Sequence, residues 1–140
     1  MSKLVKGYGE YRAGRAAKKS AYMEAKQLKR RAGLTRASSQ RASAEERRDA
    51  RYLMSKARAR AAASGGGVSD PTMVDIFADI EAGGEYNALS QLWEGEESAR
   101  GDEFAAKIRR REGRAADFAG KVGLAAGIFE QAESFAGKYG

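Results

Sequence analysis

Hydrophobic residues are sparse in the first half of this chain and recur at helical spacings in the second. From about residue 8 to residue 63 the chain is rich in Ala, Arg, Lys, Gln and Glu, and it contains no Pro. These residue types favour the α-helix, so we predict a long basic helix over residues 1–63. Gly14 and Gly33 are weak points in it, and the serine-rich stretch 36–43 is expected to fray. The few large apolar residues are too little for such a helix to be stable alone.

The segment 64–70 is the clearest interruption of the helical pattern. It reads Ser-Gly-Gly-Gly-Val-Ser-Asp and is followed by Pro71, the only proline of the chain. Three glycines permit positive φ and a sharp reversal of the backbone. Asp70 is expected to be the N-cap of a new helix, with Pro71 at its first position. The sequence therefore predicts an all-α helical hairpin with its Gly-rich turn at 64–70.

Apolar residues become denser after the turn and follow one face of a helix. Their separations are mostly three, four, seven or eleven residues, as a single helical face requires. We predict an acidic amphipathic helix over 71–112 and leave open whether Gly83-Gly84 or Gly101 interrupts it. The residues that form this stripe are Tyr86, Leu89, Trp93, Phe104, Ile108, Phe118, Val122 and Phe129.

Residues 113–140 are rich in Ala and Gly and are predicted as a third, C-terminal helix. Gly123 and Gly127 form a G-x-x-x-G pair, and Gly120 adds to the same small-residue surface. Small residues let a second helix backbone approach closely. Charged residues such as Lys121 and Glu130 argue against a lipid-exposed span. Three readings stay open: a helix contact in a soluble assembly, membrane association after a conformational change, and a disordered tail.

The charge is distributed very unevenly. The net charge is +7, but residues 1–62 hold 18 Lys and Arg against 5 Asp and Glu, whereas residues 63–140 hold 8 against 14. Within residues 71–105 there are nine acids and one base, Arg100. The basic half is suited to a polyanion such as double-stranded DNA, bound without sequence preference, or to an anionic membrane surface. Alternatively, basic and acidic halves lie against each other in an assembly.

Several kinds of chemistry are missing from the sequence. The chain has no His and no Cys, which removes zinc sites of the usual kind, thiol nucleophiles and imidazole acid–base catalysis. Its acidic residues do not follow a calcium-loop pattern, and the Gly-rich turn lacks the Lys-Ser/Thr of a phosphate loop. We therefore predict no catalytic residue, no cofactor, no metal and no enzymatic activity.

Function is expected to lie on surfaces instead of in a pocket. The basic helix offers six arginines as a polyanion-binding face. Hydrophobic and small residues of the second half are predicted to pack the hairpin or to join subunits. The predicted polyanion-binding residues are Arg30, Arg31, Arg47, Arg48, Arg58 and Arg60. The predicted packing or oligomer-interface residues are Met73, Ile76, Phe77, Ile80, Trp93, Gly120, Gly123 and Gly127.

Four segments carry a resemblance to a known family. Residues 58–68 read RARAAASGGGV, residues 70–79 read DPTMVDIFAD, residues 84–89 read GEYNAL and residues 93–101 read WEGEESARG. Over roughly residues 55–105 this arrangement resembles the small internal virion proteins, or ejection proteins, of short-tailed bacteriophages. The familiar Asp-Ala-Leu of that family stands here as Asn-Ala-Leu.

The resemblance implies a structural virion protein stored inside the capsid near the portal. Such a protein leaves with the genome and assists its ejection across the host envelope. The implied partners are further copies of the chain, the portal or other internal proteins, double-stranded DNA and the host membrane during ejection. We expect the chain to be ordered mainly by oligomerisation. The alternatives are a nonspecific DNA-binding or scaffolding helical protein and a head–tail connector or minor tail component.

Overall fold

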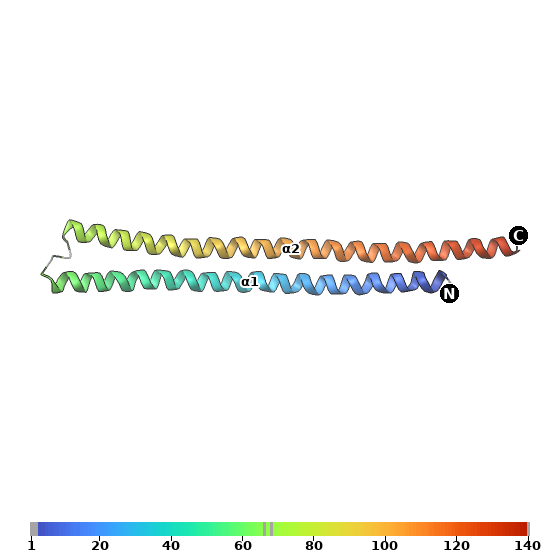
Figure 1. Cartoon of the computed structure of the whole chain (residues 1–140), viewed down its shortest axis with the longest axis horizontal. Coiled ribbons are helices and arrows are strands. Elements are labelled where there is room, and N and C mark those ends of the chain that lie inside the picture. The colour runs from blue at the N-terminus through green and yellow to red at the C-terminus, as the bar shows by residue number, and fades with distance from the viewer. Residues whose placement is uncertain (1–2, 66, 68, 140) are drawn as a thin grey trace. The chain divides into compact units, whose positions relative to one another are not determined.

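The computed structural model consists of two long helices, α1 (Lys3–Ala63) and α2 (Pro71–Tyr139), which pack against each other (Figure 1). It describes the backbone of residues 3–65, 67 and 69–139, and the side chains of residues 5–65, 67 and 69–133. No strand occurs among the residues so described. The predicted all-α helical hairpin is therefore confirmed.

The turn between the helices is built as its local sequence predicts. The helix α1 ends at Ala63, and Gly65 follows with φ 74°, a left-handed conformation that glycine adopts without strain. At the start of α2, the backbone N–H of Thr72 donates to Oδ1 of Asp70 over 2.9 Å. Asp70 is therefore the N-cap, and Pro71 occupies the first helical position, where its missing N–H costs nothing.

The helix α2 is continuous where the sequence left interruptions open. It runs through Gly83-Gly84, Gly101 and the 112–113 boundary without a break, so residues 113–139 extend α2 and do not form a separate third helix. The expected fraying at residues 36–43 was also wrong, because that stretch is α-helical throughout. Two of its serines, Ser39 and Ser43, are buried against α2 and contribute to packing.

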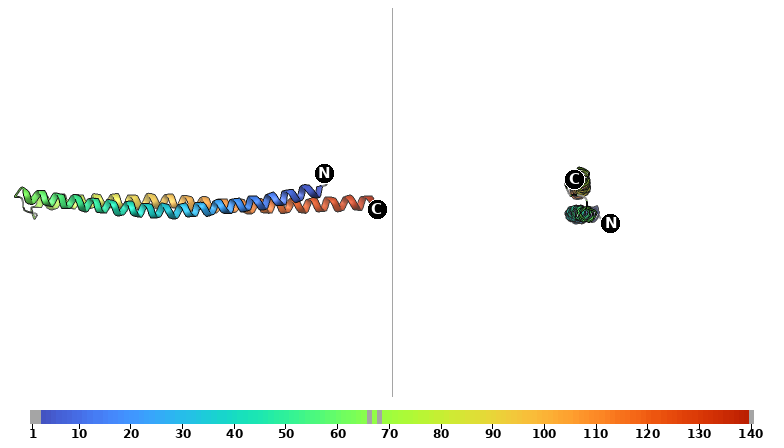
Figure 2. Two further views of the ribbon diagram at one scale, coloured as in Figure 1. Left: turned by 90° about the horizontal axis from the view of Figure 1, so that it is seen from below. Right: turned by 90° about the vertical axis from the view of Figure 1, so that its left-hand side faces the viewer.

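The chain divides into two compact units. The turn unit comprises Ala32–Arg100, and the terminal unit comprises Met1–Arg31 together with Gly101–Gly140. In each unit an arm of α1 and an arm of α2 lie side by side (Figure 2). Each unit therefore has its own contact between the two helices.

Small residues make this contact in both units. In the turn unit a Cβ added to Gly84 would collide with the Cβ of Ala50, and one added to Gly95 would collide with the side chain of Ser39. The backbones therefore approach more closely than larger side chains would permit. We call the buried residues of the two helices the seam. They are Gly7, Gly14, Ala25, Ala32, Ser39, Ser43 and Ala61 on α1, and Phe77, Gly84, Ala88, Gly95, Ala99, Asp102, Ala106, Gly113, Asp117 and Gly120 on α2.

The spacing of the seam matches the period of the helix itself. Ala25, Ser43 and Ala61 follow one another at intervals of 18 residues, as do Gly84, Asp102 and Gly120. At about 3.6 residues per turn, 18 residues complete five whole turns, so these positions return to the same face. Steps of seven residues occur within the same set, as at Ala99, Ala106, Gly113 and Gly120.

Candidate assembly and polyanion-binding surfaces

Two bidentate ion pairs connect the helices in the turn unit. The guanidinium of Arg36 donates from Nε to Oε2 of Glu96 over 2.7 Å and from Nη2 to Oε1 over 3.1 Å. Arg47 contacts both carboxylate oxygens of Glu85, each over 2.8 Å. The Arg36 hydrogen bond, with a further one from Arg100, lowers the pKa of Glu96 to about 2. The hydrogen bonding between Arg47 and Glu85 likewise lowers the pKa of Glu85 and raises the pKa of Arg47.

Further ion pairs connect the helices among the described residues of the terminal unit. Nζ of Lys18 lies 3.0 Å from Oδ2 of Asp117, and Nε of Arg31 lies 3.0 Å from Oδ2 of Asp102. Arg109 reaches Glu24 over 3.2 Å. Both aspartates are seam residues, so their carboxylates lie at the helix contact with a cation beside them. Hydrogen bonds from Lys121 and from Lys18 lower the pKa of Asp117.

The stability of the hairpin is expected to fall as the pH drops from about 5 to about 2. A carboxylate whose pKa is lowered by folding stabilises the fold above its unfolded pKa and loses that contribution as the pH falls through its folded pKa. For Glu96 the pKa is lowered from its ordinary value of 4.5 to about 2, so its contribution is lost over this interval of pH. The urea midpoint, followed by far-ultraviolet dichroism at several pH values, measures the effect. The urea midpoint of Glu96→Gln should depend less steeply on pH than that of the natural chain. An equal dependence in the two proteins would contradict the role of the Glu96 carboxylate in this loss of stability.

The six predicted polyanion-binding arginines have different surroundings. Arg31 and Arg47 are engaged in the ion pairs with Asp102 and Glu85, and the guanidinium of Arg58 lies 5.3 Å from the ring centroid of Phe77. The other three, Arg30, Arg48 and Arg60, are exposed. Polyanion binding by these six stays a prediction, and the helix contacts give three of them a second role.

A larger set of cations lies on one side of α1, outside the seam. Along a helix that advances about 100° per residue, eight exposed Lys and Arg residues fall within an arc of about 80°, and the five acids of α1 fall outside it. The members in the terminal unit are Arg12, Arg15, Lys19, Lys26 and Arg30; those in the turn unit are Arg41, Arg48 and Arg51. We call these eight residues the cationic face. Two of them, Arg30 and Arg48, were predicted from the sequence. The others were missed because the prediction followed clusters of arginine along the chain and not their positions around the helix.

The aromatic stripe of α2 faces away from α1. Tyr86, Leu89 and Trp93 in the turn unit are 72%, 52% and 68% exposed. In the terminal unit Phe104, Phe118, Val122 and Phe129 are between 51% and 73% exposed. At about 100° per residue these seven residues fall within an arc of about 60°, on the opposite side of α2 from the seam. We call them the outer apolar face.

The predicted packing residues near the start of α2 separate into two groups. Phe77 belongs to the seam and is 9% exposed, and Met73 and Ile80 are half-buried. Ile76 is 41% exposed and Trp93 is 68% exposed, so neither packs the inside of the hairpin. For Trp93 the predicted role as a subunit contact stays open.

The predicted close-packing glycines contact α1 of the same chain. A Cβ on Gly120 would lie 2.8 Å from the carbonyl oxygen of Glu10, and one on Gly7 would lie 3.2 Å from the carbonyl oxygen of Gly123. Gly127 is half-buried. The G-x-x-x-G pattern implies a closely packed partner helix. At Gly123 that partner is α1 of the same chain.

The chain matches no protein family model, no curated protein and no solved structure. Within the described residues, neither helix has a stretch sufficiently long and apolar to cross a membrane. The same part of the chain holds no group of three or more acidic residues placed to bind a metal ion.

Proposed function

We propose that this chain is a structural protein of a bacteriophage virion, which assembles as a helical oligomer inside the capsid near the portal and assists genome ejection across the host envelope. The observation that carries the assembly is the outer apolar face. A hairpin closed mainly by Gly, Ala and Ser leaves the aromatic residues of the outer apolar face exposed to water.

Burial of the outer apolar face gives the driving force for assembly. Removing apolar surface from water contributes about 25 cal/mol per Å². Trp93, Phe104 and Phe118 are each more than 60% exposed, so most of their area is available to a partner. The partner that satisfies this need is a second copy of the chain, which carries the same face.

The resemblance over roughly residues 55–105 supplies the virion setting of this proposal. The acidic stretch 71–105 suits contact with basic surfaces of the portal or of other internal proteins. The basic half suits double-stranded DNA, and the host membrane is the partner during ejection. Assembly on α2 leaves the cationic face of α1 free for such a polyanion.

Assembly predicts a discrete, largely helical oligomer whose mass is the same at low and at high salt, because apolar contacts are not screened by ions. Light scattering coupled to size exclusion measures the mass, and far-ultraviolet dichroism of the same sample measures the helix content. A helical monomer at every concentration would contradict the proposal.

The virion setting has a separate test. Mass spectrometry of purified particles of the phage that encodes the chain should detect it in filled capsids and not in capsids that have ejected their genome. Equal amounts in filled and emptied particles would indicate a fixed head or tail component and contradict a role in ejection.

A further inference from the structure

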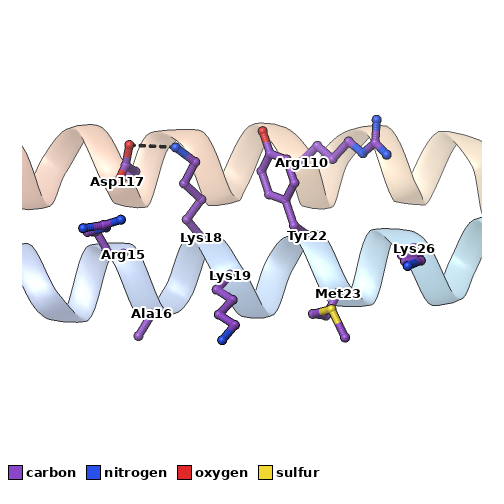
Figure 3. A pocket seen from close by; sticks show the side chains of 9 residues that line it. All are labelled: Arg15, Ala16, Lys18, Lys19, Tyr22, Met23, Lys26, Arg110 and Asp117. Atoms are coloured by element: carbon purple, nitrogen blue, oxygen red, sulfur yellow. Dashed lines mark hydrogen bonds and ion pairs between the residues drawn. The ribbon is translucent and has the colours of Figure 1, made fainter.

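A groove in the terminal unit gathers cations from both helices. It has a volume of about 840 Å³, and its charged lining consists of Arg15, Lys18, Lys19 and Lys26 from α1 and of Arg110 and Asp117 from α2. Figure 3 shows these side chains along one stretch of the two helices, with the contact between Lys18 and Asp117 drawn as a dashed line. The groove is thus a local concentration of positive charge on a chain that is already basic.

The single acid of the groove does not neutralise the other cations. The Asp117 carboxylate accepts contacts from Lys18 and Lys121, each at 3.0 Å, and is only 10% exposed. Among the described residues, Arg15, Lys19, Lys26 and Arg110 have no carboxylate within ion-pair distance. Four positive charges are therefore available to an anion, and Arg12 and Arg30 of the cationic face extend the same side of α1.

The tyrosines beside these cations are covered by guanidinium groups. Tyr22 reaches from α1 toward Arg110, whose guanidinium carbon lies 5.9 Å from the ring centroid (Figure 3). Arg15 lies 5.8 Å from the ring centroid of Tyr11. Single-stranded nucleic acid is bound largely by stacking of bases on free aromatic faces. Because a guanidinium already lies near each of these two rings, the groove favours contact with phosphates over contact with bases.

The spacing of the cations suits a duplex. Arg15, Lys19 and Lys26 are separated by four and seven residues, which is about 6 and about 10 Å along the helix axis. Double-stranded DNA carries one negative charge per about 1.7 Å of its axis, and these charges do not depend on the base sequence. A lipid surface would also require an inserted apolar face. The uncharged residues that line the groove are Ala16, Tyr22 and Met23, which do not make an extended apolar face.

We propose that this groove, with Arg12 and Arg30 at its flanks, binds the phosphate backbone of double-stranded DNA without reading its sequence. The proposal deepens the proposed function, on which its choice of DNA rests, by assigning the polyanion to one stretch of the terminal unit. The helix contact is left intact by such binding, because Arg15, Lys19 and Lys26 are exposed and take no part in the seam.

The test compares two triple variants of the full chain that lose the same charge. Arg15→Gln/Lys19→Gln/Lys26→Gln removes cations of the groove, and Lys6→Gln/Lys29→Gln/Lys56→Gln removes three exposed cations of α1 that belong neither to the groove nor to the cationic face. Fluorescence anisotropy of a short labelled duplex of mixed sequence measures affinity over a range of salt concentrations. The groove variant should bind at least about tenfold more weakly at low salt, and its slope of log K against log salt should be smaller by about 2 to 3. The control variant should keep the slope of the natural chain to within about 1.

Three results would overturn the inference. They are equal losses in the two variants, no duplex binding by the natural chain, and binding of anionic vesicles in place of DNA. Helix content measured on each variant confirms that it folds. Light scattering of the same samples separates this inference from the proposed function. An oligomer that does not bind DNA overturns only the proposal of a DNA-binding groove. A monomer that binds DNA at the groove overturns only the proposal of assembly.

Discussion

Gly84→Ala is expected to destabilise the hairpin, whereas Gly83→Ala, one residue earlier, is expected to stabilise it. A Cβ at position 84 would collide with the Cβ of Ala50, and that methyl group cannot rotate away. Forcing extra volume into a packed contact costs typically about 1–3 kcal/mol. A Cβ at position 83 meets nothing within 4 Å, so only the helix propensity changes, which favours Ala over Gly by about 0.5–1 kcal/mol.

Urea unfolding followed at the helical dichroism band gives both free energies of unfolding, with the protein concentration held equal because assembly contributes to stability. The two variants have the same composition and adjacent positions, so their difference isolates the seam. Equal stabilities would mean that the helices do not approach closely at Gly84. A second pair, Gly95→Ala against Gly101→Ala, repeats the comparison, since Gly95 faces Ser39 and Gly101 has open space.

The turn could be predicted because its chemistry is local. Consecutive glycines, an Asp N-cap and a Pro at the first helical position each act within a few residues, and all three appear at residues 64–71 as the sequence indicates. Continuity of α2 could not be predicted in the same way. Gly83-Gly84 weakens a helix by propensity, but Gly84 is also the site where Ala50 of α1 packs, and this tertiary contact outweighs the local preference.

The sequence predicted packing by Phe77 and Gly120, which do belong to the seam, but most of the seam was missed because Ala, Gly and Ser carry no strong hydrophobic signal. In a chain so rich in alanine, Ala25, Ser43 and Ala61 read as helix-forming filler. Their 18-residue interval was the available signal, since it returns each of them to one helical face. Ion pairs such as Arg47 with Glu85 depend on the register between two antiparallel helices, which the hydrophobic pattern does not fix.

The spacing of the aromatic residues in α2 did place Tyr86, Trp93 and Phe104 on a shared face. Spacing determines which residues share a face, but it does not determine what that face contacts. In an ordinary hairpin the large apolar residues would form the inner contact. Here the seam consists mainly of small side chains, although it includes Phe77, and the outer apolar face of α2 lies outside it. This inversion is the physical reason to expect further copies of the chain around α2.

Trp93→Ser is therefore expected to weaken assembly more than any substitution on the outward side of α1. Trp93 is 68% exposed in the single chain, and truncation of a buried interface tryptophan typically costs at least about 2 kcal/mol, or about thirtyfold in the dissociation constant. The control is Tyr52→Ser, because Tyr52 is also aromatic and 67% exposed but belongs to α1. Light scattering over a dilution series measures both dissociation constants.

Fluorescence gives a second readout, since Trp93 is the only tryptophan of the chain. Its emission should move to shorter wavelength on assembly, when the indole leaves water, and return to longer wavelength on dilution. The shift should be unchanged in Tyr52→Ser. An oligomer in which Trp93 emits as a fully hydrated indole would place the subunit contact elsewhere, because the outer apolar face then stays in water while the copies associate.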